Sequence, residues 1–334
     1  MLRLQIRAGV LLLGALLFLR PSLIAAPQGP VAAMYADDQA RGNAIPQGFV
    51  AASLPASGNA SATAQIYLTT GDLQRAFDEA RFRPGAAIVP TNTELQLSAK
   101  APATQQVLVD RVRKQPDAMR ALQEQVDARR SRAGGAPGQA VVLEVGVDTF
   151  VAKLSGSGSR PATGAFPATV CLVATDFPQG GAIDRRELFA QDRLRKGIAS
   201  CLGALDSAGV QSLALPLVGA ASSGIQASDP QYEGQRVLME CRMVNAVAGI
   251  ALGIHDFAPN RRNLREIGII QWDQEILDMF GAKRGVPLTG TAQSAFQAYM
   301  GQIKLALRNG LAGQKTTARD FAGSCNTIFN NAQS

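Results

Sequence analysis

The amino-acid sequence predicts an α/β protein: a three-layer α/β/α arrangement around a mixed, mostly parallel central sheet, with a helical extension at the C-terminus. Strand-like apolar runs alternate along the chain with helix-like stretches, which is the order of a parallel sheet covered on both faces. The chain has 334 residues, of which 46% are hydrophobic, enough for a sizeable core. Aromatic residues make up only 5%, which favours close α/β packing over a β-sandwich.

The first 26 residues have the pattern of a secretory signal peptide. Arg3 and Arg7 precede an apolar run over residues 10–19, and the small residues Ala25 and Ala26 close the segment. A membrane-spanning helix needs about 20 apolar residues, and this run is shorter. We therefore expect a secreted or periplasmic protein without membrane contact after cleavage, with an uncleaved anchor as the alternative.

Charge and composition exclude several kinds of partner. Removal of residues 1–26 takes away three arginines, Arg3, Arg7 and Arg20, and lowers the formal net charge from +7 to +4. This mild excess suits an anionic ligand, but the sequence lacks the dense basic stripes interleaved with aromatics that bind nucleic acid. The chain has one histidine and no CxxC pair, so we expect neither a metal site nor a cofactor.

The four cysteines leave two readings open. An even number in an oxidising compartment allows disulfides. However, Cys201 and Cys241 each share a helical face with apolar residues, and a buried thiol acting as a small hydrophobe is the favoured reading for both. Cys171 falls in a predicted strand and Cys325 in a polar tail, and the pairing of the four stays open.

The first half of the mature chain contains two clear strands. Residues 27–62 are rich in Ala, Gly, Pro and Ser and are expected to form a flexible, poorly ordered lead-in. The run 64–69 predicts a strand and 73–82 a short helix. A second strand at 86–89 leads into a polar turn at 90–93.

Helices and a further strand follow. Two helical stretches are split by Pro116, which suits a first helical position. Residues 133–138 are expected to be a flexible break, 141–147 a strand, and the Gly/Ser-rich segment 155–164 a surface loop.

The second half repeats the order of strand and helix. Its elements are a strand at 168–174, a helix at 187–208, a strand at 212–215, a helix from Pro230, a strand at 267–271 and an amphipathic helix at 289–309. Gly209 takes the position that ends a helix. We expect residues 63–283 to form the main domain and 284–334 a helical extension and tail.

The loop after the strand 212–215 consists of glycine and very small residues. The segment 215–224 reads LPLVGAASSG. In an open α/β sheet, ligands sit just past the carboxyl ends of the strands, and small residues let several backbone N–H groups approach one phosphate. Turns between a strand and a helix also use Gly and Ser for steric reasons, so this loop alone is a weak indication.

Three further segments align with this loop. The strand within 66–73 ends in Gly71-Asp72, the segment 87–95 runs into a turn with Asn92, and the segment 264–273 ends in Trp272-Asp273. Together with the loop at 219–224, their order and spacing resemble those of the macro domain. The resemblance covers about residues 63–283.

The resemblance implies a pocket for ADP-ribose or a related ADP-containing nucleotide. Asp72 would accept a hydrogen bond from the adenine amino group, and the backbone N–H of Leu73 would contact the ring. Trp272 would stack on the adenine, an interaction worth about 1–3 kcal/mol, and Asn92 would lie near the distal ribose. The amides of the second phosphate loop would hold the diphosphate, and this loop would consist of Gly219, Ala220, Ala221, Ser222, Ser223 and Gly224.

Two departures from the family pattern bear on catalysis. The family's first loop continues into a run of glycines, whereas Leu95 is followed here by residues 96–100 without a glycine. Ala220-Ala221 stands where the second loop usually has Thr-Gly. We therefore predict a binding module with weak or no catalysis. An ADP-ribosyl hydrolase or related phosphoesterase is one alternative, and a macro-fold interaction or structural protein that has lost its ligand is another.

Each of these residues could instead have a purely structural role. Asp72 suits a helix N-cap, Asn92 an ordinary turn, and Trp272 packing at a strand end. His255 lies beside Asp256, but no nucleophile motif accompanies the pair. We expect His255 to be satisfied by local hydrogen bonds at the surface or a strand end. The sequence names neither a protein partner nor an oligomeric state.

Overall fold

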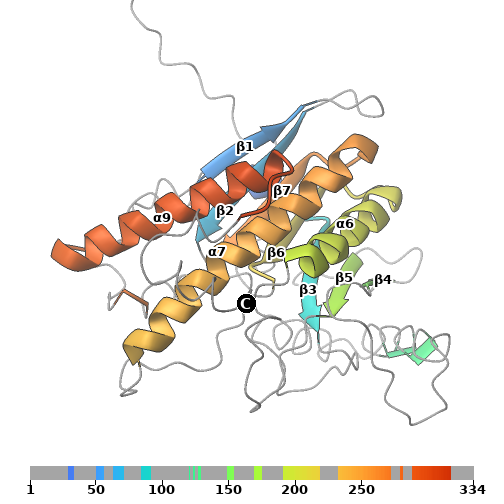
Figure 1. The fold of residues 1–334 in the computed structure, drawn as a ribbon. Coiled ribbons are helices and arrows are strands. Elements are labelled where there is room, and N and C mark those ends of the chain that lie inside the picture. The colour runs from blue at the N-terminus through green and yellow to red at the C-terminus, as the bar shows by residue number, and fades with distance from the viewer. Residues whose placement is uncertain are drawn as a thin grey trace, which may run out of the picture.

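The structure is a computed structural model, and it describes some segments of the chain and not others (Figure 1). The described residues are 29–33, 50–55, 63–70, 84–91, 120, 123–124, 127–128, 149–153, 169–174, 191–218, 232–271, 279–280 and 288–316.

The described strands form one seven-stranded sheet in the order β1-β2-β7-β6-β3-β5-β4. Its strands are β1 (Val50–Leu54), β2 (Ala64–Thr70), β3 (Ala86–Thr91), β4 (Thr149–Lys153), β5 (Thr169–Ala174), β6 (Ser212–Pro216) and β7 (Glu266–Gln271). The five inner strands are parallel to one another, while β1 and β4 pair antiparallel at the two edges. The predicted mixed, mostly parallel sheet is confirmed.

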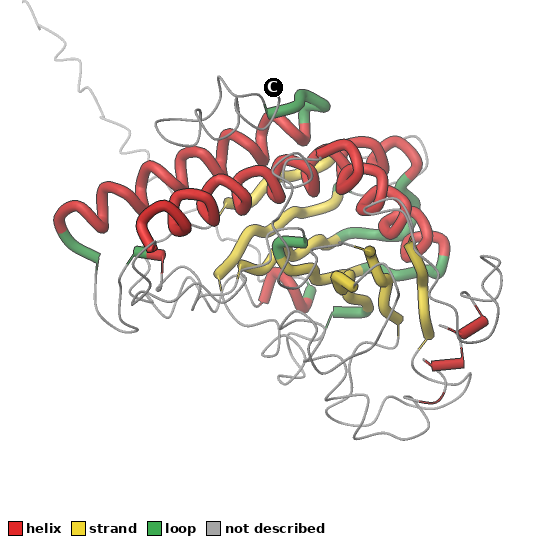
Figure 2. The backbone as a smooth tube through the Cα atoms, turned by 60° about the horizontal axis from the view of Figure 1, so that its bottom comes forward, coloured by secondary structure: helices red, strands yellow, loops and turns green. Residues whose placement is uncertain are grey.

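Three helices form a layer on one face of the sheet, as Figure 2 shows. They are α6 (Gln191–Ser207), α7 (Tyr232–Phe257) and α9 (Gly290–Leu311). The helix α7 packs against both α6 and α9, and every residue from 241 to 254 is buried. A helix that is apolar nearly all round is expected to lie in a core, and α7 is the central helix of this layer. The predicted C-terminal helix is therefore part of the main core.

Both faces of the sheet are buried. Ile66, Ile88 and Ile267 are fully buried in the core that the helices cover. Their sequence neighbours Ala87 and Gly268 point to the second face, because alternate residues of a strand face opposite sides. Ala87 is also fully buried. Burial on both faces is typical of parallel strands in a layered α/β fold.

Two strands were not expected from the sequence. β1 lies within residues 27–62, which we predicted to be a poorly ordered lead-in, and that prediction is wrong for residues 50–54. An edge strand such as β1 hydrogen-bonds on one side only, and VAASL has little of the strong β-propensity that marks central strands. β4 also lies outside every predicted element. The predicted strand at 141–147 and the predicted helix at 73–82 fall outside the described residues.

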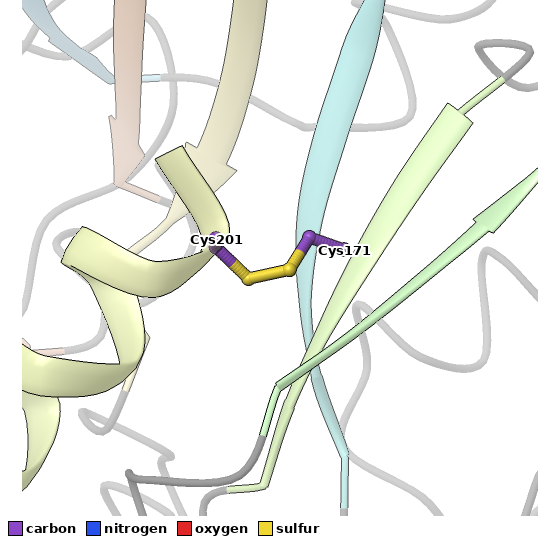
Figure 3. Close-up of a disulfide and its surroundings, with 2 residues drawn as sticks. All are labelled: Cys171 and Cys201. Carbon is purple, nitrogen blue, oxygen red and sulfur yellow. A yellow bond between two sulfur atoms is a disulfide. The ribbon is translucent and has the colours of Figure 1, made fainter. Parts of the chain in front are cut away.

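The cysteines correct a second prediction. Cys171 of β5 and Cys201 of α6 form a disulfide with 5.8 Å between their Cα atoms (Figure 3), and Cys241 of α7 is disulfide-bonded as well. The sequence favoured buried thiols for Cys201 and Cys241. An apolar helical face identifies a buried position correctly, but it cannot reveal a second cysteine on the sheet that the helix covers.

In the part of the chain that the structure describes, no helix is both long and apolar enough to span a membrane.

Candidate functional site

The candidate site lies at the carboxyl edge of the sheet. β2, β7, β6 and β3 are consecutive neighbours and run parallel, so their carboxyl ends lie along one edge. β2 and β7 end level, because Thr70 pairs with Gln271. Strand spacing of about 4.8 Å puts the ends of β2 and β3 roughly 14 Å apart.

The order of the strands changes direction between β3 and β6. After β3 the chain goes to β4 and β5 on one side of the sheet, and after β6 it goes to β7 on the other side. In open α/β sheets, this topological switch point is where ligands bind, outside the carboxyl ends of the strands. The topology thus indicates the carboxyl ends of β3 and β6 as the place where a ligand would bind.

The hydrogen-bonded ladder between β3 and β6 ends before the carboxyl ends of the two strands. β3 and β6 pair only at Ala86–Leu213 and Ala87–Ala214, although β3 continues to Thr91. Both strands carry a proline further along, Pro90 and Pro216, and proline offers no N–H to a ladder. The two strands are therefore unpaired with each other toward their carboxyl ends.

A tight turn takes the chain out of β6. Val218 N donates to Pro216 O at 2.8 Å, which closes a three-residue turn. Leu217 and Val218 are both buried, which holds this turn against the body of the domain. Val218, the last described residue before the small-residue loop, therefore lies near the carboxyl end of β6.

Each predicted site residue follows one of these four strand ends. Asp72 and Leu73 come two and three residues after β2, Asn92 directly follows β3, and Trp272 directly follows β7. The loop from Gly219 to Gly224 follows the turn after β6. These residues themselves lie outside the described part of the chain, so their side-chain positions are still a prediction.

The sequence assigned no role to the segment after β5, although β5 also ends at this edge. Thr91 of β3 pairs with Ala174 of β5, so the two strands end level. The sequence feature that could have identified this segment is the predicted strand at 168–174. A loop that follows a parallel strand beside β3 begins at the same edge of the sheet as the site. Only the strand order makes the two strands neighbours.

Among the described residues, the titratable groups with displaced pKa values have structural partners and are not among the predicted site residues. Burial raises the pKa of Glu266, which begins β7 at the opposite, amino edge. Burial also lowers the pKa of Arg261, which donates to Leu264 O and Pro55 O at the same amino edge. The hydrogen bond to Asp256 raises the pKa of Arg195 between α6 and α7. Displaced pKa values often mark catalytic groups, but these three belong to structural contacts.

His255 and Asp256 do not form a catalytic pair. His255 Nδ1 lies 3.0 Å from Leu311 O at the end of α9, and Asp256 is bound by Arg195. His255 thus has a hydrogen-bond partner, but that partner is distant in the sequence, and His255 lies in the last turn of α7 rather than at a strand end. Among the described residues, no group of His, Cys, Asp and Glu could hold a metal ion.

Comparisons with known proteins find similarity in structure and none in sequence. No family model matches the sequence, and no curated protein matches it. Solved structures of the Oceanobacillus iheyensis macrodomain do match. A mutant with ADPR has 9% identity and a TM-score of 0.44 over 78% of this chain and 100% of that chain. The same macrodomain with ADP has 11% identity and a TM-score of 0.42 over 78% and 98%. This chain is similar to them in fold. The low identity and TM-scores assign it neither a family nor a ligand.

Proposed function

We propose that this chain binds ADP-ribose or a related ADP-containing nucleotide along the carboxyl edge of the sheet, with weak or no catalysis. The strand order supports this proposal most. The predicted adenine-binding residues Asp72 and Trp272 follow β2 and β7, which are neighbours. The predicted phosphate loop follows β6, the next strand, and Asn92 follows β3, the strand after that. Adenine, diphosphate and distal ribose occur in the same order along ADP-ribose.

This agreement is independent of the order of the segments in the sequence. Along the chain, the Asn92 turn lies between the Asp72 segment and the phosphate loop, and Trp272 comes last. In the sheet, the two strands that precede the proposed adenine segments are neighbours, and the strand that precedes the proposed diphosphate segment lies beside them. β3 and β6 also stop pairing with each other before their carboxyl ends, and the loop whose amides are proposed to hold phosphate follows β6.

Weak catalysis follows from the first loop. The segment after Leu95 offers no glycine that would let the backbone wrap the distal ribose, and no acidic pair replaces it. Without a positioned base or a closely held water, the expected rate contribution of general acid–base catalysis, typically 10²–10⁴-fold, is lost. Binding needs only the amides and the adenine contacts.

Titration calorimetry of the mature chain with ADP-ribose tests the proposal. Asp72→Ala should weaken binding by about tenfold or more, since a hydrogen bond to a charged group contributes about 1.5–3 kcal/mol. Asp192→Ala is the matched control, because Asp192 is half exposed, pairs with Lys315 at 2.6 Å and is not among the predicted site residues. No heat at millimolar ADP-ribose contradicts the proposal and favours a protein without this ligand. Release of ADP-ribose from a modified protein, abolished by Asn92→Ala, favours a hydrolase.

We also propose that the chain is exported. The pattern of residues 1–26 supports export, and so do the disulfide-bonded cysteines, because disulfides persist in oxidising compartments. Cell fractionation followed by intact-mass measurement tests this. A full-length chain in the membrane pellet identifies an uncleaved anchor, and a full-length chain in the cytoplasmic fraction contradicts export.

A further inference from the structure

The chain leaves α9 through a glycine turn that lies against α7. Gly313 has φ +75°, and its N–H donates to Gly310 O at 2.9 Å, while Gln314 N donates to Asn309 O at 2.9 Å. These two bonds form the Schellman motif, in which a glycine at positive φ ends a helix. A Cβ at residue 313 would also lie 2.7 Å from Nε2 of His255 in α7. The direction of the chain after α9 is therefore fixed by this glycine.

The residues after the glycine turn reach the start of α6. Gln191, the first residue of α6, donates from Nε2 to Thr316 O at 2.9 Å and to Asn245 Oδ1 of α7 at 2.8 Å. All three residues are buried. An amide nitrogen carries two hydrogens, so these two bonds use both donors of the side chain. Gln191 thus joins α6, α7 and the chain after α9 at one buried point.

Residues 312–316 form a strap across the helical layer. α7 packs between α6 and α9 (Figure 1), and the strap connects these two outer helices. Lys315 of the strap also pairs with Asp192, but the two side chains are 53% and 56% exposed. Exposed ion pairs contribute little to stability. The buried amide of Gln191 is therefore the main fastening of the strap to α6.

A second anchor holds the later part of α6. Cys201 is joined to Cys171 of β5 by the disulfide in Figure 3, and both cysteines are fully buried. Residues 191–200 precede this covalent link. In this part, Leu194 and Ile198 pack against glycines of α7, and one ion pair joins α6 to α7. Residues 191–200 are thus held by non-covalent contacts, whereas the helix from residue 201 onward is tied to the sheet.

The start of α6 lies at the carboxyl edge of the sheet. α6 leads through residues 208–211 into β6, which begins at the amino edge, so α6 runs opposite to the strands. From Cys201 back to Gln191 the helix covers about 15 Å. From Cys171 to Ala174, the end of β5, the strand covers about 10 Å. Gln191 therefore reaches the level of the edge at which the candidate site lies.

We propose that the strap is a latch on the start of α6, and that its release lets residues 191–200 open as a local unit. This inference goes beyond the proposed nucleotide binding and does not rest on it. Folded proteins open locally in cooperative units at a lower free energy than they unfold. The unit ends at Cys201, because the disulfide holds the following residues to β5. Its opening moves a helix end at the carboxyl edge.

Hydrogen exchange of the oxidised chain in low concentrations of urea tests for the local unit. The amides of residues 195–200 are the informative ones, because the first four N–H groups of a helix have no partner within it. They should exchange together, faster than those of residues 202–207 and with a weaker dependence on urea, since a local opening exposes less surface than unfolding. Equal rates and equal urea dependence in the two groups overturn the proposal.

Gln191→Glu tests the latch itself. A carboxylate keeps the shape of the amide but donates neither hydrogen bond, so exchange at residues 195–200 should become about tenfold faster or more. Gln314→Glu is the matched control, because it makes the same change of charge at an exposed residue of the strap. Equal rates in the two variants overturn the role of Gln191.

A pair of glycine variants tests the latch from the strap, and it decides the question if Gln191→Glu does not fold. Gly313→Ala strains the turn at positive φ and overlaps the ring of His255. It should also speed exchange at residues 195–200. Gly290→Ala is the control at the other end of α9, where φ is +59° and a Cβ meets nothing within 4 Å. No acceleration with Gly313→Ala, or an equal one with Gly290→Ala, overturns the proposal.

Discussion

At the scale of single residues, buried polar side chains hold the amino edge of the sheet together. Asp206, near the end of α6, is 2% exposed and accepts three backbone N–H groups. Its donors are Arg262 at 3.0 Å, Asn263 at 2.8 Å and Leu264 at 2.7 Å. These bonds fix the segment between α7 and β7, and so they fix where β7 starts.

Replacement of Asp206 should therefore destabilise the protein in a graded way. Asp206→Ala leaves three buried donors without an acceptor and should lower the free energy of unfolding by about 2–4 kcal/mol. Asp206→Asn should cost less, because Oδ1 accepts the bonds from Asn263 and Leu264 and an amide retains that oxygen. Urea denaturation measures both. Equal losses for Ala and Asn would contradict the role assigned to Oδ1.

Single residues differ in how far the sequence predicts them. The order of the motifs predicts Gly71-Asp72, Asn92 and Trp272 as site residues, because each motif follows a recognisable strand. Glu266 and Arg261 gave no signal in the sequence, since a charged residue before an apolar strand normally suggests an exposed position. Their burial arises from segments far along the chain, residues 29–33 and Pro55.

At the scale of elements, the helical layer depends on close approach of the helix backbones. Gly249 and Gly253 of α7 face α6, and a Cβ at Gly253 would lie 2.7 Å from Ile198 Cβ and 2.8 Å from Arg195 O. Gly310 of α9 is similarly close to Ala251. The disulfide between Cys171 and Cys201 adds a covalent link from α6 to the sheet. Its loop of 30 residues corresponds to about 3–4 kcal/mol in the chain-entropy account.

Two glycine-to-alanine substitutions should have opposite effects. Gly253→Ala should destabilise the protein by about 1–3 kcal/mol, because the added methyl forces α6 and α7 apart. Gly203→Ala is the matched control in α6, where a Cβ meets nothing within 4 Å. It should stabilise by about 0.5–1 kcal/mol through helix propensity. Thermal unfolding of both variants measures this. A neutral Gly253→Ala would show that the interface adapts without cost.

At the scale of the whole molecule, α9 belongs to the core although it follows the predicted main domain. Phe296, Tyr299 and Ile303 on its inner face are buried against the rest of the core. Phe296 and Tyr299 also contact the ring of Phe280, with centroids 5.4 and 5.7 Å from it. The helix after residue 283 therefore contributes to the same core as the predicted main domain.

Removal of α9 should abolish cooperative folding. A chain that ends at residue 287 lacks α9 and leaves the side of α7 that α9 covers exposed to water. Residues 241–254 of α7 are buried all round, so this side is not polar. We expect loss of a cooperative thermal transition and of the near-UV circular dichroism signal. Lys304→Ala, on the exposed side of α9, should stay within about 0.5 kcal/mol of the parent chain. A truncated chain that unfolds cooperatively would show that α9 is dispensable.

The sequence by itself determined the alternation of strands and helices, the central strands and the segments that follow them, because local periodicity and turn residues encode these directly. β2, β3, β5, β6 and β7 were all predicted. Only the tertiary structure decided the edge strand β1, the pairing of Cys171 with Cys201 and the buried partners of Glu266, because each depends on residues distant in the chain. It also decided the order β2-β7-β6-β3, in which the strands that precede the predicted adenine, phosphate and ribose segments are consecutive neighbours. Strand neighbours are selected by packing of the whole sheet, and no local pattern records that choice.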